Sequence, residues 1–307
     1  MPMNIKNAIN QKKFFKNIHE VDLNEALKAD DLYYISKYRK AKLLIKRSII
    51  SLINFIFNKK INYSKSRDLE NVKKKYDEIS GTYIKEFEKE DTSYLAFNHF
   101  DKKNYIIKGN QIDHPSNFIS NFCKEYSLNS IFEVGAGELT TLFPIVKDHN
   151  FKFVSALDLS AERLKKGLDF FNRNNLKIDS LISGNATKLP YADNSFDLVF
   201  SHYCLEQVPL LSKKIIDEMI RVSSKYIIFI EPSYEFSNEF TRNKILVKGY
   251  PIFRKKMFEN SFSKIIYRDG MPFSRCVNYA ELVILEKNNK TSGNPMVIKS
   301  KDCIYLV

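Results

Sequence analysis

The stretch Glu133-Val134-Gly135-Ala136-Gly137-Glu138-Leu139 decides the fold, because it joins a short apolar run to a helical pattern. Gly135 and Gly137 carry no side chain, so the chain can turn tightly and a ligand can approach the backbone. Asp158 ends the next apolar run, Phe153–Leu157. A carboxylate at a strand end can accept hydrogen bonds from both hydroxyls of a ribose. The combination predicts a nucleoside-bearing cofactor on a Rossmann-like α/β core.

Outward from this motif, apolar runs alternate with helical patterns. Strands are expected over Ser130–Val134, Phe153–Leu157, Ile178–Ser183, Asp197–Ser201 and Lys225–Ile230, and helices over Pro115–Tyr126, Glu138–Asp148, Ala161–Asn174 and Leu210–Ser223. Repeated units of this kind predict a mostly parallel sheet with helices on both faces. Ser263–Tyr267 and Ala280–Leu285 follow without a long helix between them, so the sheet should end in an antiparallel hairpin.

The pattern divides the chain into three parts. A basic helical segment over 1–70 precedes an α/β domain over 71–287, whose core is 115–287, and a tail over 288–307 follows. The region 89–113 lacks periodicity and is expected to be loop. The chain has 307 residues, of which 44% are hydrophobic and 28% charged, as in an ordinary globular protein. Its four cysteines are far apart, which predicts neither a metal site nor a disulfide framework and favours the cytoplasm.

The net charge of +13 is concentrated on the two flanks of the domain, which implies an anionic partner. Within 38–60, apolar side chains fill most of the helical circumference of Leu43–Asn58, and basic residues bracket them. Such a helix either packs on its own protein as a lid or docks on an anionic membrane surface. Arg242–Lys256 is also basic, but a solvated helix face explains it more simply than nucleic acid does.

Further stretches extend the glycine motif. They are Gly184-Asn185-Ala186-Thr187-Lys188-Leu189-Pro190-Tyr191, Asn194-Ser195-Phe196-Asp197-Leu198-Val199-Phe200-Ser201, and Glu231-Pro232 after the fifth strand. Together they resemble class I S-adenosylmethionine methyltransferases, in particular the methyltransferase type 11 family. The resemblance covers roughly residues 71–287, since the helix with Tyr76-Asp77 and Tyr83 is similar to a lead-in helix of that family. The chain departs from the family at Leu139, where a third glycine is usual, and we expect only a different fit of the first helical turn.

The resemblance implies S-adenosylmethionine as cofactor and direct in-line methyl transfer to a small-molecule, lipid or glycan-type acceptor. It assigns Glu133 to the methionine amino end, and Gly135, Ala136 and Gly137 to the backbone approach. Asp158 and Leu159 are assigned to the ribose end, Asn185 and Ala186 to adenine, and Ser201 to the sulfonium side. Tyr83, in the lead-in helix, is also assigned to cofactor binding. Asn185 and Ser201 could instead be ordinary loop caps, and Asp158 a helix cap.

His202 follows the fourth strand, where the acceptor should approach, and is the candidate general base. A strand-end histidine can equally be a packed, hydrogen-bonded residue. Two other classes of function stay open. One is a methyltransferase-like binding subunit without strong catalysis. The other is a nucleotide-sugar or nicotinamide enzyme with the same glycine turn. Within the methyltransferase class, methylation of RNA through the basic flanks is a further alternative.

Overall fold

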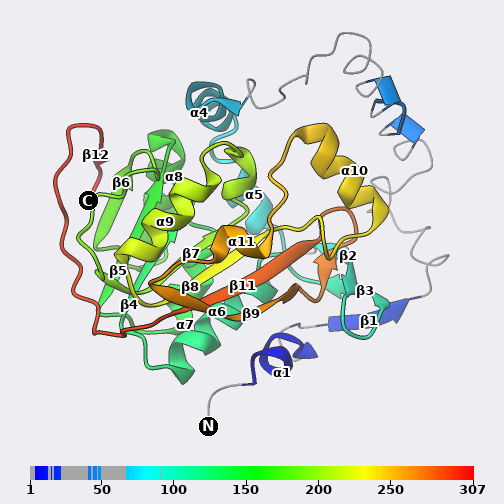
Figure 1. Ribbon diagram of the computed structural model, residues 1–307, viewed down its shortest axis with the longest axis horizontal. Helices are drawn as coiled ribbons and strands as arrows, with labels where there is room; N and C mark the ends of the chain where they lie inside the picture. The colour runs from blue at the N-terminus through cyan, green and yellow to red at the C-terminus, as the bar shows by residue number, and fades with distance from the viewer. Residues whose placement is uncertain are drawn as a thin grey trace.

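A mixed sheet runs through the centre of the computed structural model, which describes residues 4–12, 15, 17–21, 41–42, 44–46, 48–49, 67–90 and 92–307. In this part of the chain the sheet has eight strands, in the order β12 (Ile304–Tyr305), β6 (Ser180–Ser183), β5 (Phe153–Asp158), β4 (Ser130–Val134), β7 (Phe196–His202), β8 (Ser223–Pro232), β11 (Ala280–Lys287) and β9 (Ser263–Gly270) (Figure 1). The five strands from β6 to β8 are parallel, and β11 and β9 form the antiparallel hairpin. The predicted fold class is confirmed.

Two apolar cores lie on opposite faces of this sheet. One face packs against α6 (Asp113–Glu125), α7 (Leu142–Asp148) and α8 (Ala161–Arg173), and the other against α9 (Ser212–Val222) and α11 (Lys255–Phe258) (Figure 1). Neighbouring residues of β4 show the alternation, because Ile131 belongs to the first core and Phe132 to the second. A parallel strand buried on both faces reads as a continuous apolar run, which is why these strands are visible in the sequence.

The helix after the glycine turn begins later than the sequence predicts. Leu139 has a φ of 60°, in the left-handed region, so residues 138–141 are not helical and α7 begins at Leu142. Leu139 is fully buried against α8. A Cβ on Gly167 of α8 would lie 2.7 Å from Leu139 Cγ, so the glycine of the facing helix makes room for this leucine.

A second, four-stranded antiparallel sheet lies beside the core in the described part of the chain. Its order is β1 (Asn17–Val21), β3 (Lys103–Lys108), β2 (Ser93–Asn98) and β10 (Ser274–Arg275). The expectation of loop over 89–113 is therefore wrong, and β1 is a strand inside a segment expected to be helical. The sheet forms because alternate residues, Tyr94 and Ala96 in β2 and Tyr105 and Ile107 in β3, bury themselves against Phe273.

Other helices in the described part of the chain include α1 (Ile5–Ile9), α4 (Leu69–Glu78), α5 (Thr82–Phe87) and α10 (Glu239–Lys248), with the 3-10 turn η4 (Leu205–Gln207) after β7. Of the segment 38–60, residues 41–42, 44–46 and 48–49 are helical, with Leu44, Ile45 and Ile49 exposed. The other residues of the predicted lid or membrane helix lie outside the described residues. None of the described helices is long and apolar enough to cross a bilayer.

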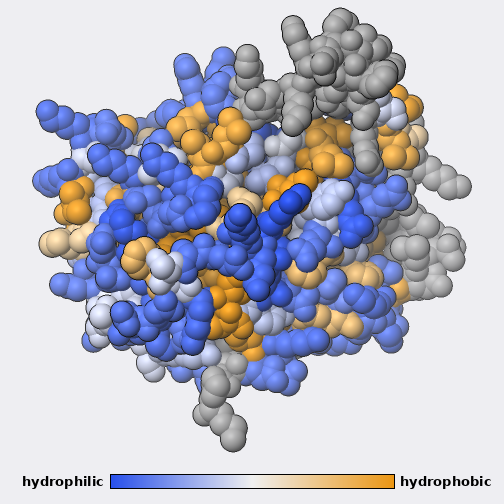
Figure 2. All heavy atoms as spheres, viewed as in Figure 1, coloured by the Kyte–Doolittle hydropathy of each residue, from blue (hydrophilic) through white to orange (hydrophobic). Residues whose placement is uncertain are grey.

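The C-terminal tail is tied to the sheet. Val297 forms an isolated bridge with Tyr191, and Gly293 donates its N–H to Asp197 Oδ1 at 2.9 Å. At the end of the tail, β12, which is red in Figure 1, pairs with β6. This pairing covers the backbone edge of β6, which would otherwise be open. On the face shown in Figure 2, hydrophilic side chains predominate between small apolar patches.

Candidate active site

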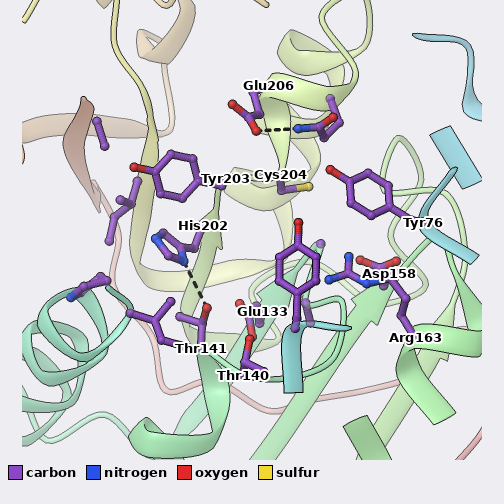
Figure 3. Close-up of a pocket in the computed structure, with 18 of the residues that line it drawn as sticks. Tyr76, Glu133, Thr140, Thr141, Asp158, Arg163, His202, Tyr203, Cys204 and Glu206 are labelled. Carbon is purple, nitrogen blue, oxygen red and sulfur yellow. Dashed lines mark hydrogen bonds between the residues drawn. The ribbon is translucent and has the colours of Figure 1, made fainter. Parts of the chain in front are cut away.

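A cavity of about 560 Å³ opens at the C-terminal ends of β4, β5 and β7. Figure 3 shows Asp158 and Arg163 on one side of it, His202 and Tyr203 on the other, and Glu133 and Glu206 between them at opposite edges of the view. The cavity brings together nine of the residues assigned from the sequence, which are Tyr83, Glu133, Gly135, Ala136, Asp158, Leu159, Asn185, Ala186 and His202. Gly137 and Ser201 are not among its lining residues.

Glu133 presents an unsatisfied carboxylate to the cavity. It is buried at the end of β4, and its Oε2 has no hydrogen-bond partner in the described chain. Burial and the nearby charge of Asp158 raise the pKa of Glu133 well above the usual value of a carboxyl. A buried acceptor without a partner is costly, so this atom fits a donor that arrives with a ligand.

Asp158 is held in place by the backbone. Its Oδ2 accepts the Gly137 N–H at 2.9 Å, and its Oδ1 accepts the Ser160 N–H at 2.8 Å. Each carboxylate oxygen has two lone pairs, so each retains one for a hydroxyl in the cavity. Ser160 also begins α8, since its Oγ accepts the Arg163 N–H at 3.1 Å as predicted for an N-cap.

The two glycines of the turn serve different neighbours. Both have left-handed φ values, 77° at Gly135 and 53° at Gly137. A Cβ on Gly135 would lie 2.5 Å from Cys204 Cβ, and a Cβ on Gly137 would lie 2.5 Å from Arg163 Cζ. Gly137 is therefore covered by Arg163 and is not among the residues that line the cavity, so its contact with the cofactor stays a prediction.

Arg163 lines the cavity, although the sequence did not indicate it as a site residue. Only 10% of its side chain is exposed, and its guanidinium lies over the rings of Tyr76, at 4.9 Å, and Tyr83, at 4.6 Å. Its Nε is 3.5 Å from Glu138 Oε1, but no described group accepts a hydrogen bond from its two terminal nitrogens. The Glu138 carboxylate is engaged elsewhere, because it accepts the N–H groups that begin α5. The edge of the guanidinium that carries the two terminal nitrogens lies against Gly137 and is free of described acceptors, and Arg163 lines the cavity.

The adenine side of the predicted site is formed by the loop after β6. Asn185 and Ala186 line the cavity, and Asn185 Oδ1 accepts the Thr187 N–H at 3.0 Å, which fixes the loop. Ser201 is not among the residues that line the cavity. Its hydroxyl donates to Glu231 Oε1 at 3.1 Å, and both side chains are fully buried beneath the cavity. Ser201 thus supports the turn after β7 because the carboxylate of β8 takes its hydroxyl.

The opposite end of the cavity is aromatic. His202 Nδ1 is 3.1 Å from Thr141 Oγ1, and burial lowers the pKa of His202 to about 4, so its ring is neutral at pH 7. Tyr203 has a φ of 53°, an uncommon value for a bulky residue, and its hydroxyl donates to the Asn278 carbonyl at 3.1 Å. Tyr94 and Phe273 of the small sheet complete the walls.

Glu206 is the second residue that the sequence left without a role. It lies in η4, lines the cavity and is 8% exposed. Its Oε1 accepts from Gln207 Nε2 at 2.5 Å, while Oε2 is buried without a partner in the described chain. Burial raises the pKa of Glu206 to about 7. The cavity thus combines the charged groups Glu133, Asp158 and Arg163 with aromatic walls beside which His202 and Glu206 also line it.

Residues 132–228 match a family model described as "Methyltransferase domain". A curated relative, the demethylmenaquinone methyltransferase of Bacillus mycoides (strain KBAB4), is 35% identical over 115 residues, which are 36% of this chain and 48% of the relative. The chain thus spans about half the length of the curated relative that it matches.

The chain is also similar to solved structures, and one of them, the [4+2]-cyclase SpnF, shares its fold. SpnF superposes with a TM-score of 0.52 and 13% identity, over 72% of this chain and 97% of that chain. Magnesium protoporphyrin IX methyltransferase from Synechocystis PCC 6803, solved with bound SAH, gives a TM-score of 0.47 and 10% identity, over 59% of this chain and 89% of that chain.

Proposed function

Because residues 132–228 form a class I S-adenosylmethionine methyltransferase domain of the type 11 family, we propose that this chain methylates a small-molecule acceptor. The observation that carries the proposal is a single cavity with two chemically different ends. One end holds charged groups complementary to S-adenosylmethionine, and the other is an aromatic chamber for the acceptor. A cavity of about 560 Å³ is in the range of small-molecule sites.

The charged groups fit the cofactor group by group. The unpartnered Glu133 Oε2 would accept from the methionine ammonium, and the free edge of Arg163 would donate to the methionine carboxylate. The free lone pairs of Asp158 would accept from the ribose hydroxyls. An arginine fork matches a carboxylate with two parallel hydrogen bonds, so the zwitterionic end can bind in only one orientation.

When bound, S-adenosylmethionine supplies an activated methyl group on a positively charged sulfur. The protein's task is then to hold the acceptor in line behind that methyl group and to exclude water. Orientation of two reactants can contribute about 7–11 kcal/mol to the lowering of a barrier. The buried walls formed by His202, Tyr203 and Phe273 favour a flat, largely apolar acceptor in this position. The name of the curated relative supports a small molecule over nucleic acid.

Calorimetry and methyl transfer test the proposal separately, which matters because one fold can host different chemistries. Titrations with S-adenosylmethionine and S-adenosylhomocysteine should show binding, and NADH should show none. The protein is then incubated with radiolabelled S-adenosylmethionine and the small-molecule, lipid and RNA fractions of a cell extract. Label in the small-molecule fraction is expected.

Asp158→Ala is the negative control for this assay. Since it removes the ribose contact, it gives the amount of label that appears without specific cofactor binding. Label that appears only in RNA would refute the acceptor class. Absence of S-adenosylhomocysteine binding would refute the cofactor site itself. Binding without transfer to any fraction would favour the alternative of a methyltransferase-like binding subunit.

A further inference from the structure

The turn after β7 brings Glu206 to the aromatic end of the cavity. Tyr203 reverses the chain with its left-handed backbone, and Cys204 then lies against Gly135 of the glycine turn. Glu206 follows two residues later, in η4. Glu206 lines the same cavity, and in Figure 3 it lies beyond Tyr203 and Cys204 as seen from Glu133.

This turn is held by an internal carboxylate. Glu231 Oε1 accepts the N–H groups of Cys204 and Leu205, both at 3.1 Å, and Glu231 Oε2 accepts that of Glu206 at 3.4 Å. Three N–H groups directed at one buried carboxylate fix the backbone of η4. The position of Glu206 is thus set by β8 and does not depend on a mobile loop.

The side chain of Glu206 is fixed from one side only. Arg67 donates to Gln207 Oε1 at 3.1 Å and to the Glu206 carbonyl at 3.3 Å, which orients the Gln207 amide so that its Nε2 donates to Glu206 Oε1. The second oxygen, Oε2, is buried and has no partner in the described chain. One carboxylate oxygen is therefore anchored and the other is available.

Aromatic and basic groups surround this carboxylate. The charged and titratable groups whose fields reach it come from several elements: Arg67 before α4, Lys75 and Tyr76 in α4, Tyr83 in α5, Tyr203 and Cys204 after β7, Glu231 in β8, Lys244 and Lys248 in α10, and Tyr250 after it. The basic groups favour the ionised carboxylate, and burial opposes it. The balance leaves Glu206 able to gain or lose a proton near neutral pH.

We propose that Glu206 accepts a proton from the methyl acceptor, and that the acceptor carries an ionisable hydroxyl on an aromatic ring. This inference rests on the proposed function and adds the acceptor's chemistry to it. The hydroxyl proton moves to Glu206 Oε2, and an oxygen lone pair forms the new bond to the methyl carbon. The bond between that carbon and sulfur breaks, and its electron pair stays on sulfur, so the products are the methyl ether, S-adenosylhomocysteine and protonated Glu206.

His202 is less suited to this role. Its Nδ1 is engaged with Thr141, and burial lowers the pKa of its ring to about 4. A base with so low a pKa takes a phenolic proton less readily than a carboxylate whose pKa is about 7. The prediction of His202 as base and the proposal for Glu206 are separable, because the two groups titrate in different pH ranges.

The first test needs no acceptor. S-adenosylmethionine and S-adenosylhomocysteine differ by a methyl group and the positive charge that it brings to sulfur, so a carboxylate near the reacting centre favours the former when it is ionised. We expect the affinity ratio of the two ligands to rise at least about threefold between pH 6 and pH 8, with a midpoint near 7, as Glu206 loses its proton. Glu206→Gln should abolish this step.

Lys244→Met is the companion variant for that step. Burial lowers the pKa of Lys244 to about 8, and the charge of Lys244 in turn lowers the pKa of Glu206, so its removal should keep the step but move its midpoint above 7. A flat ratio in the wild type, or a step that persists in Glu206→Gln, would overturn the proposal. If neither ligand binds the wild type, the proposed function fails instead.

The second test uses phenol, 4-nitrophenol, aniline and thiophenol as acceptors. The wild type should methylate the phenols, and Glu206→Gln should lower kcat with phenol about a hundredfold or more while the affinity for S-adenosylhomocysteine is unchanged. A phenol that is already ionised in solution, such as 4-nitrophenol, should depend much less on Glu206, and Glu206→Asp should recover part of the rate. Transfer only to aniline or thiophenol, no transfer to either phenol, or equal losses with both phenols would overturn the assignment.

Discussion

Replacement of Arg163 by methionine isolates one contact of the cofactor site. Methionine has a similar length and no charge, so it keeps the apolar contact with Tyr76 and Tyr83 and removes the donor fork. A hydrogen bond to a charged group contributes about 1.5–3 kcal/mol net. For a buried fork that is 10% exposed we take about 2–3 kcal/mol, which corresponds to a loss of affinity for S-adenosylhomocysteine of about 30- to 150-fold.

The decisive comparison uses decarboxylated S-adenosylhomocysteine, which retains the amine, ribose and adenine. If Arg163 binds the carboxylate, the wild type should prefer S-adenosylhomocysteine strongly, and Arg163→Met should lose that preference while its affinity for the decarboxylated ligand changes by no more than about twofold. Isothermal titration calorimetry measures both ligands on both proteins. Arg173→Met is the control, because Arg173 lies on the same helix but is half-exposed and paired with Glu88 at 2.7 Å.

Equal weakening of both ligands by Arg163→Met would refute the reasoning. That result would mean that the guanidinium acts as a wall between Tyr76 and Tyr83 and not as a carboxylate receptor. Thermal unfolding of each variant separates this outcome from loss of the fold, since cation–π contacts at such sites contribute about 0.5–2 kcal/mol each.

Three further predictions follow from the site and the flanks. Asp158→Ala should weaken S-adenosylmethionine binding at least tenfold, or about 1.4 kcal/mol, in calorimetry, and unchanged affinity in a folded variant would reject the ribose contact. Gly135→Val should abolish cofactor binding and also lower the Tm, because even a Cβ there would lie 2.5 Å from Cys204 Cβ; an unaltered Tm with retained binding would contradict this. For residues 38–60 we propose docking on anionic membranes, so the protein should float with anionic liposomes at low salt. The double substitution Lys59→Glu and Lys60→Glu should reduce this flotation. No flotation of the wild type would favour a lid.

The central sheet could be predicted because its strands are buried on both faces. Ser130–Val134 and its parallel neighbours read as continuous apolar runs, and their lengths fit strands. The hairpin β2–β3 was missed because its apolar runs, 94–97 and 105–107, are short, and its buried face is complete only when Phe273 arrives from the far end of the chain. The two-residue strand β12 has no pattern of its own and exists only because β6 offers an edge.

The residues of the candidate site likewise fall into those that a sequence pattern predicts and those that depend on tertiary contacts. Glu133 and Asp158 could be predicted because the ends of parallel strands meet at one edge, so a residue there is placed by the fold itself. Arg163 and Glu206 could not be found in this way. Their roles depend on burial, and on which of their atoms lack a partner, both of which arise from helices and turns that meet only in the folded chain.

The close packing of Leu139 in the glycine turn against Gly167 in α8 has a consequence for any attempt to redesign the turn. The small residue that allows close approach is on the helix here, at Gly167, instead of in the loop. Gly167→Ala should therefore be harmful beside Leu139 but tolerated better once Leu139 is replaced by glycine, although the Glu138 carbonyl, 2.9 Å from the new Cβ, would still limit the gain. The two positions form an epistatic pair, and a library that varies the turn alone would reject substitutions that become acceptable when the helix changes with it.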